Sequence, residues 1–401
     1  MARYTYIKFY GYVYSLKFTQ QISLAENMKL GFIVNPIAGM GGRVGLKGTD
    51  GVLKEAIARG AKPVAPKRAV EFLQKLKEST SEASLSIEIL TCPGIMGEEE
   101  AKRASFSVEV LPMKIGGETT AEDTKTAVKL MVRSNVDLIV FVGGDGTAKD
   151  ILDVMRDGSQ TPVLGIPSGV KMYSGIFAVN PSDAVDVVLA FAQNQAEITE
   201  FEIMDADEKA IRSDNFAVKL YGFLKGPFLP MRIQGTKQVS PATVDEKENQ
   251  TAIARFIIEE MRPEATYLLG PGTTVKRIAE LLGVEKTLLG VDIYRKGKVL
   301  LDVDEKKILE EVRDWEKTWI ILSPIGHQGI LLGRGNQQIS PEIIKRVGKQ
   351  KIIVAATKSK LKSIEGGVLR VDTGDAEADN MLKGYIRVVT DYREWRLMPV
   401  Q

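Results

Sequence analysis

The sequence predicts an α/β protein with two domains, a doubly wound domain over residues 28–200 and a β-rich second domain over residues 201–401. In the first half, short apolar runs alternate with stretches of helical spacing, and glycine-rich stretches fall where the runs end. The second half changes to shorter alternating runs separated by turn-forming residues. A chain of 401 residues also exceeds the size at which one core stops growing.

The first domain has the pattern of repeated strand, loop and helix. Residues 30–34 form a short apolar run that ends at an Asn-Pro dipeptide, which is typical of a buried parallel strand. Residues 136–142 form another such run. Apolar residues have helical spacing over 127–132 before it and over 151–155 after it. This βαβ pattern predicts a doubly wound sheet, in which ligands bind outside the carboxyl ends of the strands.

The second domain is predicted to be mainly strands, with one α/β insertion near residues 250–290. In the insertion, a strand over residues 267–269 meets Gly270-Pro271-Gly272-Thr273-Thr274, and residues with helical spacing follow. The other predicted strands of this half cover residues 198–204, 216–224, 299–303, 352–356, 369–371 and 386–389.

The first 27 residues are rich in aromatic side chains and precede an internal methionine, Met28. Two interpretations remain open. The segment forms an additional hairpin or interface arm, or it is an extension ahead of a working domain that begins at Met28. We favour the second. The aromatic residues are Tyr4, Tyr6, Phe9, Tyr10, Tyr12, Tyr14 and Phe18.

Composition excludes several classes of protein. The 54 basic and 52 acidic residues nearly cancel, and no long basic run is present, so a nucleic-acid partner is not expected. Cys92 is the only cysteine and His327 the only histidine, which excludes a disulfide framework and a His/Cys zinc site within one chain. No apolar run is long enough to span a membrane. We therefore expect a cytoplasmic protein without a membrane partner.

The strongest local signal is the run Gly143-Gly144-Asp145-Gly146-Thr147, which stands between a predicted strand and a predicted helix. Glycines let the backbone approach a phosphate, and the free amides of a helix start attract anions. A carboxylate beside phosphates is unfavourable unless it meets Mg²⁺ or accepts a proton, so Asp145 is the candidate base. The alternative is a tight turn in which the aspartate caps the helix.

Two further loops follow predicted strands and are candidates to face the same crevice. Neither matches a P-loop or a dinucleotide fingerprint. The alternatives are a flexible surface loop for the first and an ordinary turn for the second. The first supplies the candidate phosphate ligands Asn35, Pro36, Gly39, Gly41, Gly42, Arg43 and Lys47, and the second supplies Pro167, Ser168, Gly169 and Lys171.

In the second domain, Gly272, Thr273 and Thr274 open a helix and offer amides and hydroxyls to an anion. The alternative is a helix start capped by one of the threonines. His327, Arg334 and Asn336 lie in a second glycine-rich neighbourhood. A lone histidine is more often structural than a ligand.

The 143–147 turn after a strand, with Asn35-Pro36 and a glycine loop at the first strand, resembles the ATP-NAD kinase family. Residues 31–51, 167–171 and 270–274 are similar to a prokaryotic, largely archaeal branch of predicted ATP-NAD kinases. The resemblance covers nearly everything after Met28. It implies a nucleotide-binding first domain, ATP with Mg²⁺ as cofactor, a base at Asp145, an acceptor site in the second domain and a homo-oligomer.

The resemblance leaves the phosphate acceptor open. Familiar NAD kinases carry an Asn-Glu or Asn-Asp dipeptide that grips the dinucleotide, and this sequence contains neither. The Gly-Thr-Gly-Asn-Asp turn of lipid kinases is also missing. We expect a kinase that phosphorylates the 2′-hydroxyl of NAD. The alternatives are a kinase of another hydroxylated metabolite or a lipid, a non-catalytic nucleotide-binding protein and an assembly role. Polyphosphate as the donor is a further open alternative.

Overall fold

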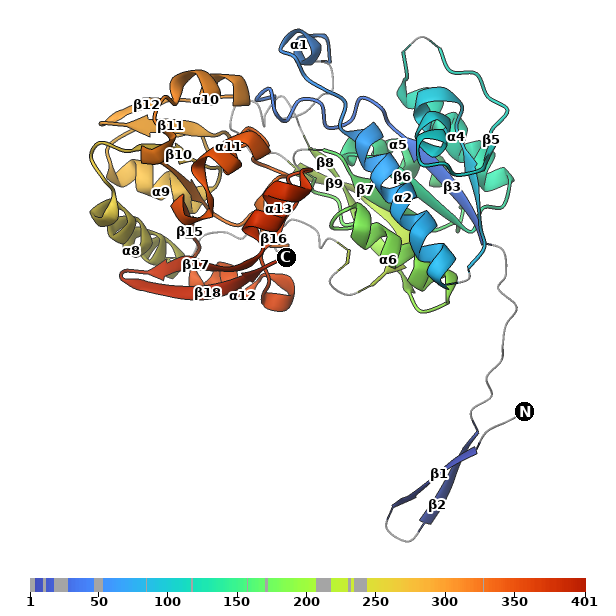
Figure 1. Cartoon of the computed structure of the whole chain (residues 1–401). Helices are drawn as coiled ribbons and strands as arrows, with labels where there is room; N and C mark the ends of the chain where they lie inside the picture. Colours follow the sequence, from blue (N-terminus) through green and yellow to red (C-terminus); the bar gives the residue numbers. More distant parts are fainter. Residues whose placement is uncertain are drawn as a thin grey trace.

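The computed structural model describes residues 4–9, 12–17, 28–46, 53–83, 85–116, 118–156, 158–169, 172–206, 218–229, 232–233, 244–326 and 328–401. Two α/β units lie side by side, one from each half of the chain (Figure 1). We refer to residues 28–233 as the first half and to residues 244–401 as the second half. Ahead of them, β1 (Tyr4–Phe9) and β2 (Tyr12–Lys17) form an antiparallel hairpin.

The first half is built on a five-stranded parallel sheet of order β5-β4-β3-β6-β7. The chain leaves β3 toward one edge of the sheet and later leaves β6 toward the other edge. The doubly wound fold is therefore confirmed, and its switch point lies between β3 and β6. The strands are β3 (Met28–Val34), β4 (Ile87–Thr91), β5 (Val108–Val110), β6 (Leu138–Gly143) and β7 (Val163–Pro167).

The two faces of this sheet carry separate cores because successive side chains of a strand point to opposite faces. Leu30, Phe32 and Val34 of β3 pack with residues of α2 and α6, whereas Ile33 packs with residues of α4 and α5. Helices thus cover both sides of the sheet. The helices of the first half are α1 (Leu53–Ala58), α2 (Ala65–Ala83), α3 (Glu98–Arg103), α4 (Ala121–Arg133), α5 (Asp145–Met155) and α6 (Pro181–Ala192). Of these, α1 packs on the loop after β3 and not on the sheet.

An antiparallel ribbon of β8 (Glu197–Ala206) and β9 (Val218–Phe228) follows the first sheet. Ile203 and Leu224 of the ribbon are buried in the core that contains α4 and α5. The ribbon therefore belongs to the packing of the first half, although its sequence has the alternating pattern of the β-rich region.

The second half contains a seven-stranded sheet of order β12-β11-β10-β13-β15-β17-β18. Its central strands β10, β13, β15 and β17 are parallel, and the outer strands are antiparallel to their neighbours. The strands are β10 (Thr266–Leu269), β11 (Asp292–Arg295), β12 (Lys298–Leu300), β13 (Thr318–Leu322), β15 (Ile352–Ala355), β17 (Gly384–Asp391) and β18 (Glu394–Val400).

Helices and a short parallel pair complete the second half. The strand and helix expected near residues 250–290 are β10 and α9, and β10 lies inside the seven-stranded sheet. The helices are α8 (Val244–Glu260), α9 (Thr273–Leu281), α10 (Glu305–Glu311), α11 (Pro341–Val347), α12 (Lys358–Lys362) and α13 (Ala376–Leu382), and the pair is β14 (Ile330–Leu332) with β16 (Arg370–Val371). Across the described residues, no helix is long and apolar enough to cross a membrane.

Candidate functional site

The turn of residues 143–147 joins the buried strand β6 to α5, as the sequence predicts. Gly143 ends the strand, Gly144 is the N-cap residue, and Asp145 begins the helix. A Cβ atom on Gly143 would lie 2.5 Å from Oγ1 of Thr147, so the turn is too tight for a larger residue there. The first amides of α5 have no partner within the helix, and an anion is favoured beside them.

Backbone contacts bring the two other predicted loops of the first domain to this turn. The amide of Asn35 donates to the carbonyl of Val142 at 2.9 Å, and the amide of Ser168 donates to the carbonyl of Gly143 at 3.0 Å. Gly39 has a φ of +80°, and a Cβ atom on it would stand 1.7 Å from the carbonyl oxygen of Ser168. The loops after β3, β6 and β7 therefore touch one another at the switch point of the sheet.

The carboxylate of Asp145 is held by a neighbouring loop. The amide of Tyr173 donates to Oδ2 at 2.8 Å, and the amide of Ser174 donates to Oδ1 at 2.9 Å. Both partners lie just beyond the predicted 167–171 turn and outside α5. A carboxylate oxygen accepts more than one hydrogen bond, so this anchoring fixes the orientation of Asp145 and leaves it able to accept a proton.

Asn35 connects the first loop to the same turn. Its Nδ2 donates to Oγ1 of Thr147 at 2.9 Å, and its Oδ1 accepts from the amide of Ile37 at 3.3 Å. Thr147 is buried. The side chain of Asn35 was predicted to contact phosphate, and in the structure it holds two loops together.

Two features at the carboxyl ends of β6 and β7 are not accounted for by contacts within the described residues. Gly144 has an ordinary negative φ, and no described atom lies within 4 Å of the place where its Cβ would be. The hydroxyl of Ser168 is shielded from solvent and has no hydrogen-bond partner among the described residues. A ligand that approached the backbone at Gly144 and accepted the Ser168 proton would account for both.

The other predicted phosphate ligands have different placements. Gly41 and Gly42 are buried in the loop after β3, whose turns are closed by bonds from Leu46 to Gly41 and from Gly45 to Gly42. Arg43 of that loop is exposed. Pro36 follows Asn35, Pro167 ends β7, and Gly169 packs on Met172. Lys47 and Lys171 lie outside the described residues.

The predicted acceptor loop lies at the carboxyl end of β10. Gly272 is the N-cap residue of α9 with a φ of +112°, and no side chain caps this helix. Thr274 is buried, and Oγ1 of Thr273 accepts a 3.3 Å bond from Gln250. None of the hydrogen bonds and ion pairs between described residues joins this loop to the 143–147 turn.

Arg334 and Asn336, the other predicted acceptor ligands, are buried. Asn336 closes its own turn, because its Oδ1 accepts from the amide of Gly333 at 3.0 Å and its Nδ2 donates to the carbonyl of Leu331 at 2.9 Å. Arg334 reaches across to the first half and donates to the carbonyl of Val179 at 2.7 Å. His327 lies outside the described residues.

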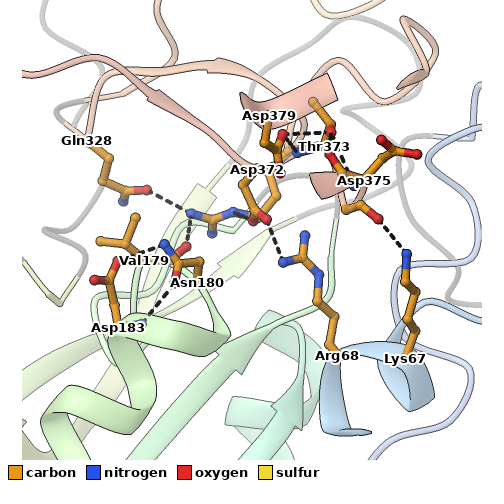
Figure 2. Close-up of polar contacts among 12 residues, drawn as sticks. Lys67, Arg68, Val179, Asn180, Asp183, Gln328, Asp372, Thr373, Asp375 and Asp379 are labelled. Carbon is orange, nitrogen blue, oxygen red and sulfur yellow. Dashed lines mark hydrogen bonds and ion pairs between the residues drawn. The ribbon is translucent and has the colours of Figure 1, made fainter. Parts of the chain in front are cut away.

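Sequence reasoning missed the ion pair that joins the two halves, which Arg68 and Asp372 form (Figure 2). Arg68 of α2 contacts Asp372 at 2.5 Å, and Arg334 contacts the other oxygen of Asp372 at 3.6 Å. Burial lowers the pKa of Arg334 to about 10. Burial also acts to lower the pKa of Arg68, but the hydrogen bond and charge of Asp372, together with the charges of Glu71 and Asp379, outweigh it and raise that pKa. No sequence signal connects Arg68 with Asp372, which lie 304 residues apart.

Comparison with known proteins agrees with both halves of this description. The family model described as the ATP-NAD kinase N-terminal domain matches residues 30–196, and the model described as the ATP-NAD kinase C-terminal domain matches residues 262–400. The curated proteins include no match to this chain.

Proposed function

Because the chain belongs to the ATP-NAD kinase family, we propose that Asp145 is the base with which it transfers the γ-phosphate of ATP to the 2′-hydroxyl of NAD. The matched domains are those of a kinase that phosphorylates NAD with ATP. The observation that supports the assignment of Asp145 is its position: an oriented carboxylate at the start of α5, at the switch point of the first sheet.

The phosphates of ATP have a suitable place beside this carboxylate. The amides at the start of α5 and the open space beside Gly144 favour close approach of a phosphate group. The hydroxyl of Ser168, which has no hydrogen-bond partner among the described residues, supplies a further donor. In this proposal Asn35 and Thr147 hold the loops in position, and Gly143, Gly144 and Gly146 let the phosphates approach the backbone.

Mg²⁺ fits this arrangement as an ion held mainly by the substrate. The described residues contain no group of three or more His, Cys, Asp or Glu side chains that would hold a metal. Mg²⁺ commonly binds through one or two carboxylates together with substrate phosphates, and Asp145 is the carboxylate in reach of the phosphate site. When bound, the ion neutralises phosphate charge. The chain's own contribution is to position the two substrates and to accept the hydroxyl proton at Asp145.

The acceptor is proposed to contact the second half through Gly272, Thr273 and Thr274. The uncapped start of α9 supports this, because its amides have no side-chain partner. Arg334 and Asn336 support the acceptor site indirectly in this proposal, since their polar atoms bind the protein itself. The composition and the family resemblance support a cytoplasmic homo-oligomer, which light scattering of the purified protein would test.

The proposal is tested by the NADP that purified protein forms from ATP, Mg²⁺ and NAD, measured with an NADP-specific dehydrogenase. Asp145→Asn keeps the size of the side chain and removes the base. We expect a fall in kcat of about 10²- to 10⁴-fold with ATP affinity retained. Equal turnover by parent and variant would remove Asp145 from the mechanism. If the protein consumed ATP only in the presence of another hydroxylated compound, that compound and not NAD would be the acceptor.

A further inference from the structure

A basic cavity lies between the two halves, and no residue of the 143–147 turn lines it. Its volume is about 200 Å³. The first half contributes residues of the loop after β3 and of the start of α2, and the second half contributes residues around Gly333, Ser340 and Gly374. The loop is tied to the second half because the amide of Glu305 donates to the carbonyl of Arg43 at 3.2 Å.

The charges in the walls of this cavity are unbalanced. Four cationic side chains line it, Arg43, Lys62, Lys67 and Arg68, against the single carboxylate of Glu71. Arg68 is paired with Asp372, and Lys67 donates to the carbonyl of Gly374 (Figure 2).

The side chains of Arg43 and Lys62 contact no carboxylate or other acceptor among the described residues. Arg43 also lines an adjoining groove, where the cations of the second half are paired: Lys345 pairs with Asp375 and Arg346 pairs with Glu342. Cations that outnumber the carboxylates of a cavity raise the local concentration of anions.

The opposite wall of the cavity offers a donor that lacks a partner. The hydroxyl of Ser340 is shielded from solvent and has no hydrogen-bond partner in the described part of the chain. Ser340 is the N-cap residue of α11, but its side chain makes no capping bond. A polar group that is buried without a partner is costly, and a phosphate oxygen that accepts the hydroxyl proton removes that cost.

We propose that this cavity binds a phosphate group of one of the two substrates, with Lys62 and Arg43 as its cationic ligands. The inference deepens the proposed function and rests on it for the choice of ligands. Both ATP and NAD carry the required chemistry, a chain of linked phosphates. A ligand held here contacts both halves at once, so its binding stabilises their mutual arrangement.

The test measures binding rather than turnover, by calorimetry with ATP, NAD and inorganic pyrophosphate as separate probes. Lys62 is exposed and makes no contact that folding requires. Lys62→Ala is expected to weaken binding of at least one probe about tenfold, and Lys62→Arg is expected to restore most of the affinity. Loss confined to ATP assigns the cavity to the donor, and loss confined to NAD assigns it to the acceptor.

Lys75→Ala is the matched control. Lys75 lies on α2, the helix that follows Lys62, and it is exposed and does not line the cavity. Its replacement by alanine changes the net charge by the same amount as Lys62→Ala. Affinities that stay within about twofold of the parent for all three probes in Lys62→Ala would overturn the inference. If no NADP is formed but Lys62→Ala still weakens ATP or pyrophosphate binding, the cavity assignment stands and only the acceptor assignment fails.

Discussion

Two glycine-rich turns occupy corresponding positions in the two halves of the molecule. Residues 143–147 join β6 to α5, and residues 270–274 join β10 to α9. Each turn follows a buried strand at the carboxyl edge of a sheet, and each opens a helix whose N-cap residue is a glycine. Their backbones therefore offer similar anion sites.

The two turns differ in the charges around them. The first carries the carboxylate of Asp145, fixed by the amides of Tyr173 and Ser174. Beside the second, Ser323 accepts a 3.1 Å bond from Nζ of Lys360, whose pKa is lowered by burial to about 8. A carboxylate suits proton transfer, whereas a cation suits the binding of an anion. The fold supplies the same turn twice, and neighbouring side chains determine the chemistry of each.

The largest difference in stability between the two sites is expected from one glycine at each: Gly39, in the loop that contacts the first turn, and Gly272, in the second turn. Gly39→Ala should lower the free energy of unfolding by about 4 kcal/mol, because its φ is positive and its Cβ would overlap the carbonyl oxygen of Ser168. Gly272→Ala should cost about 2 kcal/mol, since the strained backbone is its only obstacle: the nearest atom is 3.9 Å away. Urea unfolding of both variants measures the difference. Equal losses would show that the loops after β3 and β7 do not touch as described.

The sequence was sufficient to predict β3 and β6, because both are uninterrupted apolar runs that end in glycine-rich turns. It was also sufficient to place Asp145 between a strand and a helix. Strand β13, with the sequence TWIIL, was not singled out. A short apolar run cannot be distinguished from a buried helix segment by its periodicity alone.

The contacts that complete the site were beyond the reach of the sequence for a physical reason. The partners of Asp145 are backbone amides, which every residue except proline possesses, so they leave no pattern. Asn336 illustrates a different ambiguity. A glycine-rich neighbourhood with a polar side chain has the same appearance whether that side chain binds a ligand or closes its own turn.

A smaller loss of unfolding free energy is expected when a threonine hydroxyl is removed from each of the two turns. Thr147→Val leaves the half-buried amide of Asn35 without its acceptor, the buried Thr147 hydroxyl, and should cost about 1 kcal/mol of unfolding free energy. Thr273→Val removes only the longer bond from Gln250 at an exposed position and should cost less than about 0.5 kcal/mol. Thermal unfolding distinguishes the two. A Thr147 variant as stable as the parent would mean that the Asn35 bond does not hold the loop.

The smallest change in stability is expected at Gly144, where a substitution should affect ATP kinetics and leave the fold intact. Its φ is ordinary and its Cβ would meet no described atom, so Gly144→Ala should leave the unfolding free energy within about 0.5 kcal/mol of the parent. A phosphate that packs against this backbone would meet the new methyl group, and we expect kcat/KM for ATP to fall about tenfold. Gly143→Ala is the contrasting variant, because its Cβ would overlap Thr147 and destabilise the fold itself. Unchanged kinetics in a stable Gly144→Ala protein would show that the phosphates of ATP do not approach the turn at this residue, and would direct the search for their site to the loop after β3.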